Sequence, residues 1–291
     1  MTDGAPTHRA TTDGARTDRV LPYTRAVGAF IIPFLVAAWG ILYLFPANTD
    51  TLFAWTILPP VTAMFLGSAY LGGIWFFVQV VRPNQWHAVR WGFPAVLVFS
   101  TLLATATFLH WVKFHFGHIS FIVWVTLYVI TPFLVLAAMI VNRREDPRVP
   151  DDRDVVVPAW VRILLAVVGL AALACGLFLF VVPQVAIDVW GWPLTPLTAR
   201  VAGAILTLPG MVNVWMLGDS RWSAFRQVFQ AQLASLVCIT LALTLRNGEL
   251  LWSRSAAPLF VAGIAGSLVA YAALYLWLEL RLRRAAAPVA T

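Results

Sequence analysis

The chain has 291 residues, of which 60% are hydrophobic and only 11% are charged. Soluble domains average about 45–50% apolar and about 25% charged residues, so this composition predicts a protein that spans a membrane several times. The net charge of +7 comes from basic residues scattered between apolar runs, which excludes a nucleic-acid-binding face. Cys175 and Cys238 lie inside apolar runs, which excludes a disulfide framework.

The first 22 residues are rich in Thr, Asp, Gly, Ala and Arg and lack the apolar centre of a signal peptide. We expect them to form a disordered polar tail. Eight segments that follow are long and apolar enough to cross a bilayer. They cover residues 26–45, 59–82, 93–112, 119–142, 158–182, 196–217, 226–245 and 257–280. The sequence therefore predicts an all-α integral membrane protein with about eight transmembrane helices.

Arginine and lysine in the connections orient these spans, because cytoplasmic loops carry an excess of both. With the N-terminus in the cytoplasm, sixteen basic residues fall on the inner side and four on the outer side. The outer four are Lys113, Arg200, Arg246 and Arg254. The strong bias toward arginine over lysine is typical of GC-rich bacterial genes. We expect a bacterial inner-membrane protein with both termini in the cytoplasm.

Tryptophans gather near both predicted boundaries of the spans. Such amphipathic rings prefer the headgroup level, which predicts an aromatic belt on each side of the membrane. The belt residues are Trp55, Trp111, Trp190, Trp192 and Trp252 on the outer side and Trp86, Trp91, Trp160 and Trp222 on the inner side.

The sequence resembles itself at a shift of 136 residues. The segment PPVTAMFLG (59–67) aligns with TPLTARVAG (195–203), and NQWHAVR (84–90) aligns with SRWSAFR (220–226). Each copy contains four spans, an even number, so we expect two parallel repeats related by an axis along the membrane normal. The predicted organisation is a cytoplasmic tail (1–22), a four-span repeat (23–142), a charged cytoplasmic linker (143–157), a second four-span repeat (158–284) and a short tail (285–291).

The segments FAWTILPPVTAMFLGSAY and WGWPLTPLTAR resemble parts of an uncharacterised family of bacterial multi-pass membrane proteins. The resemblance covers the repeated elements only. It implies the fold and carries no activity with it.

Three of the five histidines lie in the stretch HWVKFHFGH, between the third and fourth spans. Imidazole is the commonest metal ligand in proteins, so His110, His115 and His118 are candidate ligands for Zn or Cu in a metal-dependent membrane enzyme. The alternative is that they are polar residues at the surface end of a helix hairpin. The second half has no histidine at the corresponding positions, which favours this alternative.

Polar residues inside the spans are few, and they are candidates for a polar cavity between the halves or for helix–helix hydrogen bonds. These candidates are Tyr70, Gln79, Arg200 and Asn213. Arg90 and Arg226 lie at the inner boundary, where we expect contacts with lipid phosphates.

Other cofactors find little support in the sequence. Residues 158–291 contain no histidine, so haem held by histidines of both halves is not expected. The sequence shows no nucleotide-binding motif, no HExxH motif and no recognisable Ser-His-Asp set.

The leading interpretation is a non-enzymatic membrane protein: a scaffold, a partner-binding subunit or a carrier of a small or lipidic solute. Membrane lipids are the expected partners, and a protein partner or homo-oligomer is left open.

Overall fold

The computed structural model describes residues 17–82, 84–149 and 154–286. Residues 1–16 of the predicted tail, 150–153 of the predicted linker and 287–291 at the C-terminus lie outside the described residues. Within the described ranges the chain is helical and forms no β-strand. Residues 17–21 are tied to the rest of the fold, because the Asp18 N–H donates to the Glu145 carbonyl at 3.1 Å.

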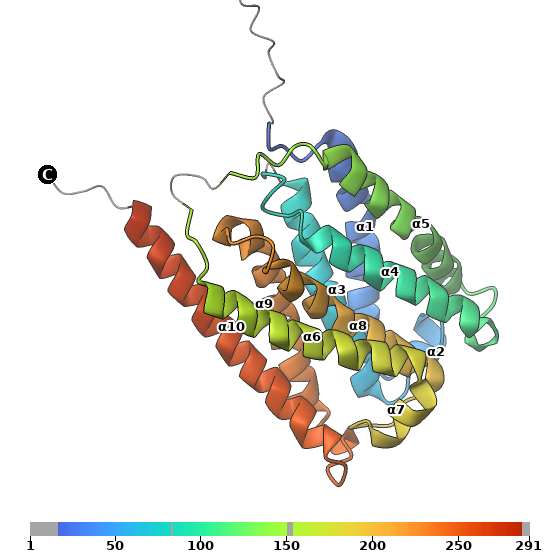
Figure 1. Ribbon diagram of the computed structural model, residues 1–291. Coiled ribbons are helices and arrows are strands. Elements are labelled where there is room, and N and C mark those ends of the chain that lie inside the picture. The colour runs from blue at the N-terminus through green and yellow to red at the C-terminus, as the bar shows by residue number, and fades with distance from the viewer. Residues whose placement is uncertain (1–16, 83, 150–153, 287–291) are drawn as a thin grey trace, which may run out of the picture.

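In the described part of the chain, eight helices are long and apolar enough to cross a membrane, which confirms the predicted all-α, multi-pass class and the number of spans. They are α1 with its π-helical end (Pro22–Leu44), α3 (Pro60–Val81), α4 (Gly92–Leu109), α5 (Ile119–Asn142), α6 (Ala159–Val181), α8 (Pro196–Trp215), α9 (Trp222–Leu245) and α10 (Ala256–Ala286). Two short helices, α2 (Thr49–Leu52) and α7 (Pro183–Val189), precede α3 and α8. Figure 1 shows the spans packed as one bundle.

The two ends of this bundle differ in composition. The arginine-rich end comprises residues 17–21, 82, 84–91, 142–149, 154–162, 216–226 and 279–284, and the hairpin end comprises residues 45–59, 110–118, 182–195 and 246–255. In Figure 1 the hairpin end, with α2 and α7, lies toward the lower right.

The helices α3 and α8 both begin with a proline, whose missing N–H removes one unpaired donor from the helix start. At α8 the remaining donors are capped locally, because Thr195 and Thr198 each accept a backbone N–H of the other. At α3 a side chain from the other half does this, since Glu249 accepts from the Val61 N–H at 2.7 Å. The start of α3 is therefore bound to the hairpin between α9 and α10.

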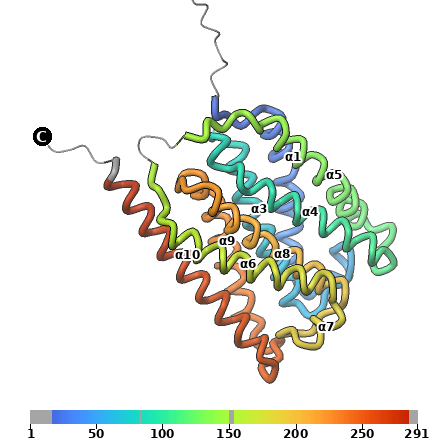
Figure 2. The backbone as a smooth tube through the Cα atoms, viewed as in Figure 1, coloured from blue at the N-terminus to red at the C-terminus, as the bar shows by residue number. Residues whose placement is uncertain are grey.

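The spans 22–142 and 159–286 interlock. Helix α3 packs against α9 of the other half, and α4 packs against α8 in the corresponding way. Inside each half, α1 packs on α3 and α6 packs on α8. Gly176 and Gly203 bring α6 and α8 so close that a Cβ on either would collide with the carbonyl oxygen of the other. Helices α3 and α8 are the most buried spans, and Figure 2 shows α5 and α10 on the outside.

Backbone contacts recur at an offset of 136 or 137 residues. In the first half the Trp86 N–H donates to the Asp18 carbonyl, and in the second the Trp222 N–H donates to the Val155 carbonyl, each at 2.9 Å. The two 3₁₀ turns of the hairpin end, 111–113 and 247–249, are related by the same offset. Each half thus holds the connection between its second and third spans against the segment that precedes its first span.

Several tryptophans predicted for the aromatic belts lie in the protein interior instead. Five of them are between 0% and 6% exposed: Trp55, Trp86, Trp190, Trp192 and Trp222. The belt prediction is wrong for these five, because they pack on other aromatic rings at the ends of the bundle; Trp192, for example, contacts Phe65 and Phe260. Trp111 and Trp160 are exposed, as a belt requires.

Candidate functional site

His110 lies at the C-terminal end of α4 and pairs with an arginine of the other half. Arg200 Nη1 lies 2.7 Å from His110 Nε2. An arginine can only donate, so Nε2 of His110 must accept. Burial, together with the positive charges of Arg200 and Lys113, lowers the pKa of His110 below its ordinary value. The neutral imidazole therefore serves to hold Arg200 at the hairpin end.

The other two histidines of this hairpin are also used locally. His115 contacts the Phe53 carbonyl through Nδ1 and the Thr56 hydroxyl through Nε2. His118 Nδ1 lies 2.5 Å from Ser120 Oγ, at the start of α5. Among the residues that the structure describes, no three His, Cys, Asp or Glu side chains are placed to hold a metal ion, so the predicted set His110, His115 and His118 does not converge.

A cavity of about 250 Å³ lies inside the bundle, between the two halves. All eight spans contribute to its wall, which is mostly aliphatic and aromatic. An apolar cavity of roughly 150 Å³ is large enough to bind benzene, so this one can take a small apolar molecule or part of a longer chain.

The wall of the cavity uses corresponding positions of the two halves. At an offset of 136 residues, lining positions pair as Ala69 with Ile205, Tyr70 with Leu206, Phe76 with Val212, Gly92 with Val228, Ala95 with Ala231, Val96 with Gln232 and Phe99 with Ser235. The cavity therefore lies where the halves meet, and neither half could form it alone.

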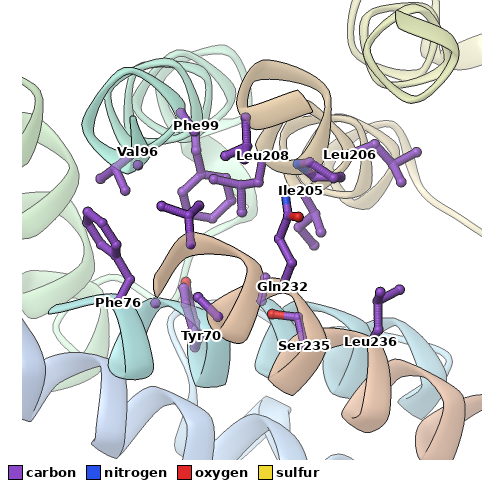
Figure 3. A pocket seen from close by; sticks show the side chains of 18 of the residues that line it. Tyr70, Phe76, Val96, Phe99, Ile205, Leu206, Leu208, Gln232, Ser235 and Leu236 are labelled. Atoms are coloured by element: carbon purple, nitrogen blue, oxygen red, sulfur yellow. The ribbon is translucent and has the colours of Figure 1, made fainter. Parts of the chain in front are cut away.

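Two amide side chains bring unpaired polar atoms to this apolar wall. Gln232 on α9 has both Oε1 and Nε2 buried without a hydrogen-bond partner among the described residues. Asn213 on α8 donates to the Tyr271 hydroxyl through Nδ2, and its Oδ1 is likewise unpaired within the described ranges. Figure 3 shows Gln232 extending between Phe99 of α4 and Ile205 of α8.

The four residues proposed from the sequence for a polar cavity divide into two groups. Tyr70 and Asn213 line the cavity, and the Tyr70 hydroxyl is hydrogen-bonded to that of Tyr128 at 2.8 Å. Gln79 is buried near the arginine-rich end of α3, and Arg200 is engaged with His110 at the opposite end. Sequence inspection missed Gln232, although it is a polar residue in the middle of a predicted span.

Arg221 at the arginine-rich end lies between two aspartates. Its guanidinium contacts Asp219 at 2.7 and 2.9 Å and Asp146 at 3.0 Å. Burial alone would raise the pKa of both carboxyls, but hydrogen bonds from Arg221 hold each pKa below its usual range. Hydrogen bonding to Asp219 is the main reason why the pKa of Arg221 is raised. These charges fix the connection before α9 to the segment after α5.

Arg90 and Arg226, expected at lipid phosphates, both have carboxylate partners in the protein. Arg90 forms an ion pair with Asp146, and Arg226 Nε lies 2.7 Å from Glu279 Oε1. Contact of either arginine with lipid stays a prediction.

A chain of hydrogen bonds at the arginine-rich end crosses from one half to the other. His87 Nδ1 lies 2.5 Å from Asp18 Oδ2, and His87 Nε2 lies 3.0 Å from Ser223 Oγ. Ser223 Oγ in turn donates to Asp154 Oδ2 over 2.5 Å. No Ser-His-Asp set is recognisable in the sequence, yet Asp18, His87 and Ser223 lie within hydrogen-bond distance in that order.

The similarity of the sequence to itself at a shift of 136 residues contains the signal that could have revealed this cluster. Asp18 and Asp154 are 136 residues apart, and so are His87 and Ser223. In both halves the aspartate also accepts the backbone N–H of its partner, at 3.0 Å from His87 and at 3.1 Å from Ser223. Two copies of one aspartate-capped turn therefore meet at the boundary between the halves.

Comparison of the chain with protein-family models, with curated proteins and with solved structures found no match. Inference of function therefore depends on the geometry of the cavity and of the charged clusters.

Proposed function

We propose that this chain is a non-enzymatic bacterial inner-membrane protein that binds a small lipidic solute between two tandem four-span repeats, as a carrier does. The central cavity is the observation that carries this proposal. It is apolar, it lies within the spans, and corresponding positions of both halves line it. Carriers place their substrate sites near the midplane, where structural repeats meet.

The placement in the membrane is supported by the distribution of basic residues. Most of the described arginines lie at the arginine-rich end, which includes the described N-terminal segment and the end of α10. Under the positive-inside rule this end faces the cytoplasm, so both termini are cytoplasmic. The backbone contacts that recur at 136–137 residues support a tandem, parallel arrangement of the halves.

The chemistry of the cavity indicates a solute with an apolar body and one polar group. The residue that corresponds to Gln232 in the first half is Val96, so a free amide lies on one side only. An unpaired buried polar group costs about 1–3 kcal/mol, which a bound polar group can relieve. A hydroxyl can donate to Oε1 and accept from Nε2, so an apolar alcohol matches this amide.

Native mass spectrometry of the protein purified in mild detergent tests the proposal. We expect the wild-type chain to retain a small apolar molecule and Gln232→Leu to bind it roughly tenfold more weakly, because one buried hydrogen-bonded group is lost. Gln230→Leu is the matched control, since Gln230 on the same helix contacts Trp75 and Tyr275 instead. Equal retention by the wild type and Gln232→Leu, or no retained molecule in either, would contradict the proposal.

A further inference from the structure

The hydrogen bonds of the chain Asp18–His87–Ser223–Asp154 need a definite number of protons. Each of its three contacts, at 2.5, 3.0 and 2.5 Å, requires one proton between the two heavy atoms. Ser223 supplies one proton and a neutral imidazole supplies one, while ionised carboxylates supply none. The complete chain therefore holds one proton more than these four groups contain with both aspartates ionised and His87 neutral.

The geometry indicates where this extra proton belongs. Ser223 donates its only proton to Asp154, so its oxygen must accept from His87 Nε2. An ionised Asp18 can only accept, so Nδ1 of His87 also donates. A ring that donates from both nitrogens is an imidazolium. This polarity is the reverse of a catalytic triad, in which the serine gives its proton to the imidazole.

We propose that Asp18, His87, Ser223 and Asp154 form a proton-binding site that fastens the two halves together at the arginine-rich end. Without the extra proton, one of the three contacts has no hydrogen between its two heavy atoms, so two lone pairs repel each other there. The His87–Ser223 contact is the longest of the three and is the one that crosses between the halves. Loss of the proton therefore releases the halves from each other at this point.

The surroundings of the site are charged, and burial limits access of water. Asp18 and His87 are 9% and 6% exposed. Binding of the proton halves the net negative charge of the four groups. The charged groups on the neighbouring segments are Arg19 beside Asp18, Glu145 after α5, Arg90 after His87, and the set of Asp146, Asp219 and Arg221, in which two carboxylates share one guanidinium.

The site is next to the wall of the central cavity. Five residues after Ser223, Val228 lines the cavity, and five residues after His87, Gly92 lines it at the corresponding position. Ser223 and Val228 both lie in α9, where five residues amount to about 7.5 Å, whereas His87 lies in the turn that leads into α4 at Gly92. Loosening of the His87–Ser223 contact therefore acts close to the starts of both helices. Proton binding at the site does not depend on the proposed function of the cavity.

Nitrogen NMR of the ¹⁵N-histidine-labelled, full-length protein at pH 7 tests the proposal, with the His87 signals assigned by their loss in His87→Gln. We expect His87 of the wild type to carry protons on both ring nitrogens. In Ser223→Ala and in Asp154→Asn a larger share of His87 should carry a single ring proton, because a hydrogen bond or a negative charge that favours the imidazolium is gone.

His118 is the internal control, because it contacts a serine, Ser120, at the opposite end. Its signals should be the same in all variants. A wild-type His87 ring with a single proton overturns the proposal. So does a share of doubly protonated His87 that neither Ser223→Ala nor Asp154→Asn lowers.

Discussion

The two ends of the bundle are held together by different interactions. At the hairpin end, large aromatic side chains pack on one another. Trp192 packs on Phe65 and Phe260, and Trp55 packs on Trp124. At the arginine-rich end, buried ion pairs and the chain of hydrogen bonds through His87 do so. Apolar packing responds little to pH, whereas carboxylates and imidazoles titrate. The difference indicates that a change of pH alters the interactions at the arginine-rich end more than those at the hairpin end.

The largest expected effect is at the hairpin end. Trp192→Ala removes a fully buried side chain and its hydrogen bond to the Thr62 hydroxyl of the other half. We expect a loss of about 3–5 kcal/mol in the free energy of unfolding, measured in detergent, because a large cavity remains. Trp252→Ala is the control, since Trp252 is 47% exposed and should cost far less. Similar losses for both variants would show that aromatic packing does not close this end.

The next effect is at the arginine-rich end. Arg221→Met removes the common partner of Asp146 and Asp219 and leaves both carboxylates buried. We expect the free energy of unfolding to fall by about 3 kcal/mol, because breaking a buried ion pair leaves a buried charge without a partner. The control is Arg246→Met, whose partner Glu249 is 3.6 Å away in a more exposed pair and whose loss should cost under about 1 kcal/mol. An unaffected Arg221→Met protein would contradict the assignment of stability to this cluster.

The smallest effect is the dependence of stability on pH. The pKa of Asp146 and of Asp219 is lower in the folded protein than in the unfolded chain. Their contribution is therefore present above the unfolded pKa of about 3.9 and is lost as the pH falls toward the folded values. We expect about 1 kcal/mol less stability at pH 4 than at pH 6, from unfolding curves at each pH.

The same pH series separates the two ends. Trp192→Ala should show the pH dependence of the wild type, because the ion pairs remain intact. Asp146→Asn with Asp219→Asn should show a weaker dependence, because both titrating groups are gone. An undiminished pH dependence in the double variant would show that other groups are responsible.

The spans could be predicted from the sequence because membrane insertion depends on a local average of hydropathy. The predicted fourth span, 119–142, coincides with α5 (Ile119–Asn142), and the other boundaries differ by a few residues. The same average does not say which face of a span meets protein. The sequence therefore predicts Trp55 and Trp192 as belt residues, although both are buried in the protein.

The candidate site could be predicted only in part, because it depends on contacts between distant segments. His115 and His118 are only three residues apart in the sequence, but Gly117 between them has a φ of +81°, so the two residues do not share a helical turn. The cavity draws on all eight spans, so the role of Gln232 follows from the packing of α9 against α3. The Asp18–His87–Ser223 contacts required the two halves to be placed together.

The central claim, a lipidic solute bound between the halves, is tested most directly by filling the cavity. Val96 on α4 lines it, so Val96→Trp should occupy the space of the solute. Val129→Trp on α5 is the control, because Val129 is 39% exposed on the bundle surface. Quantification of bound apolar molecules per chain should give near-complete loss in Val96→Trp and the wild-type amount in Val129→Trp. An undiminished amount in a folded Val96→Trp protein would contradict the account.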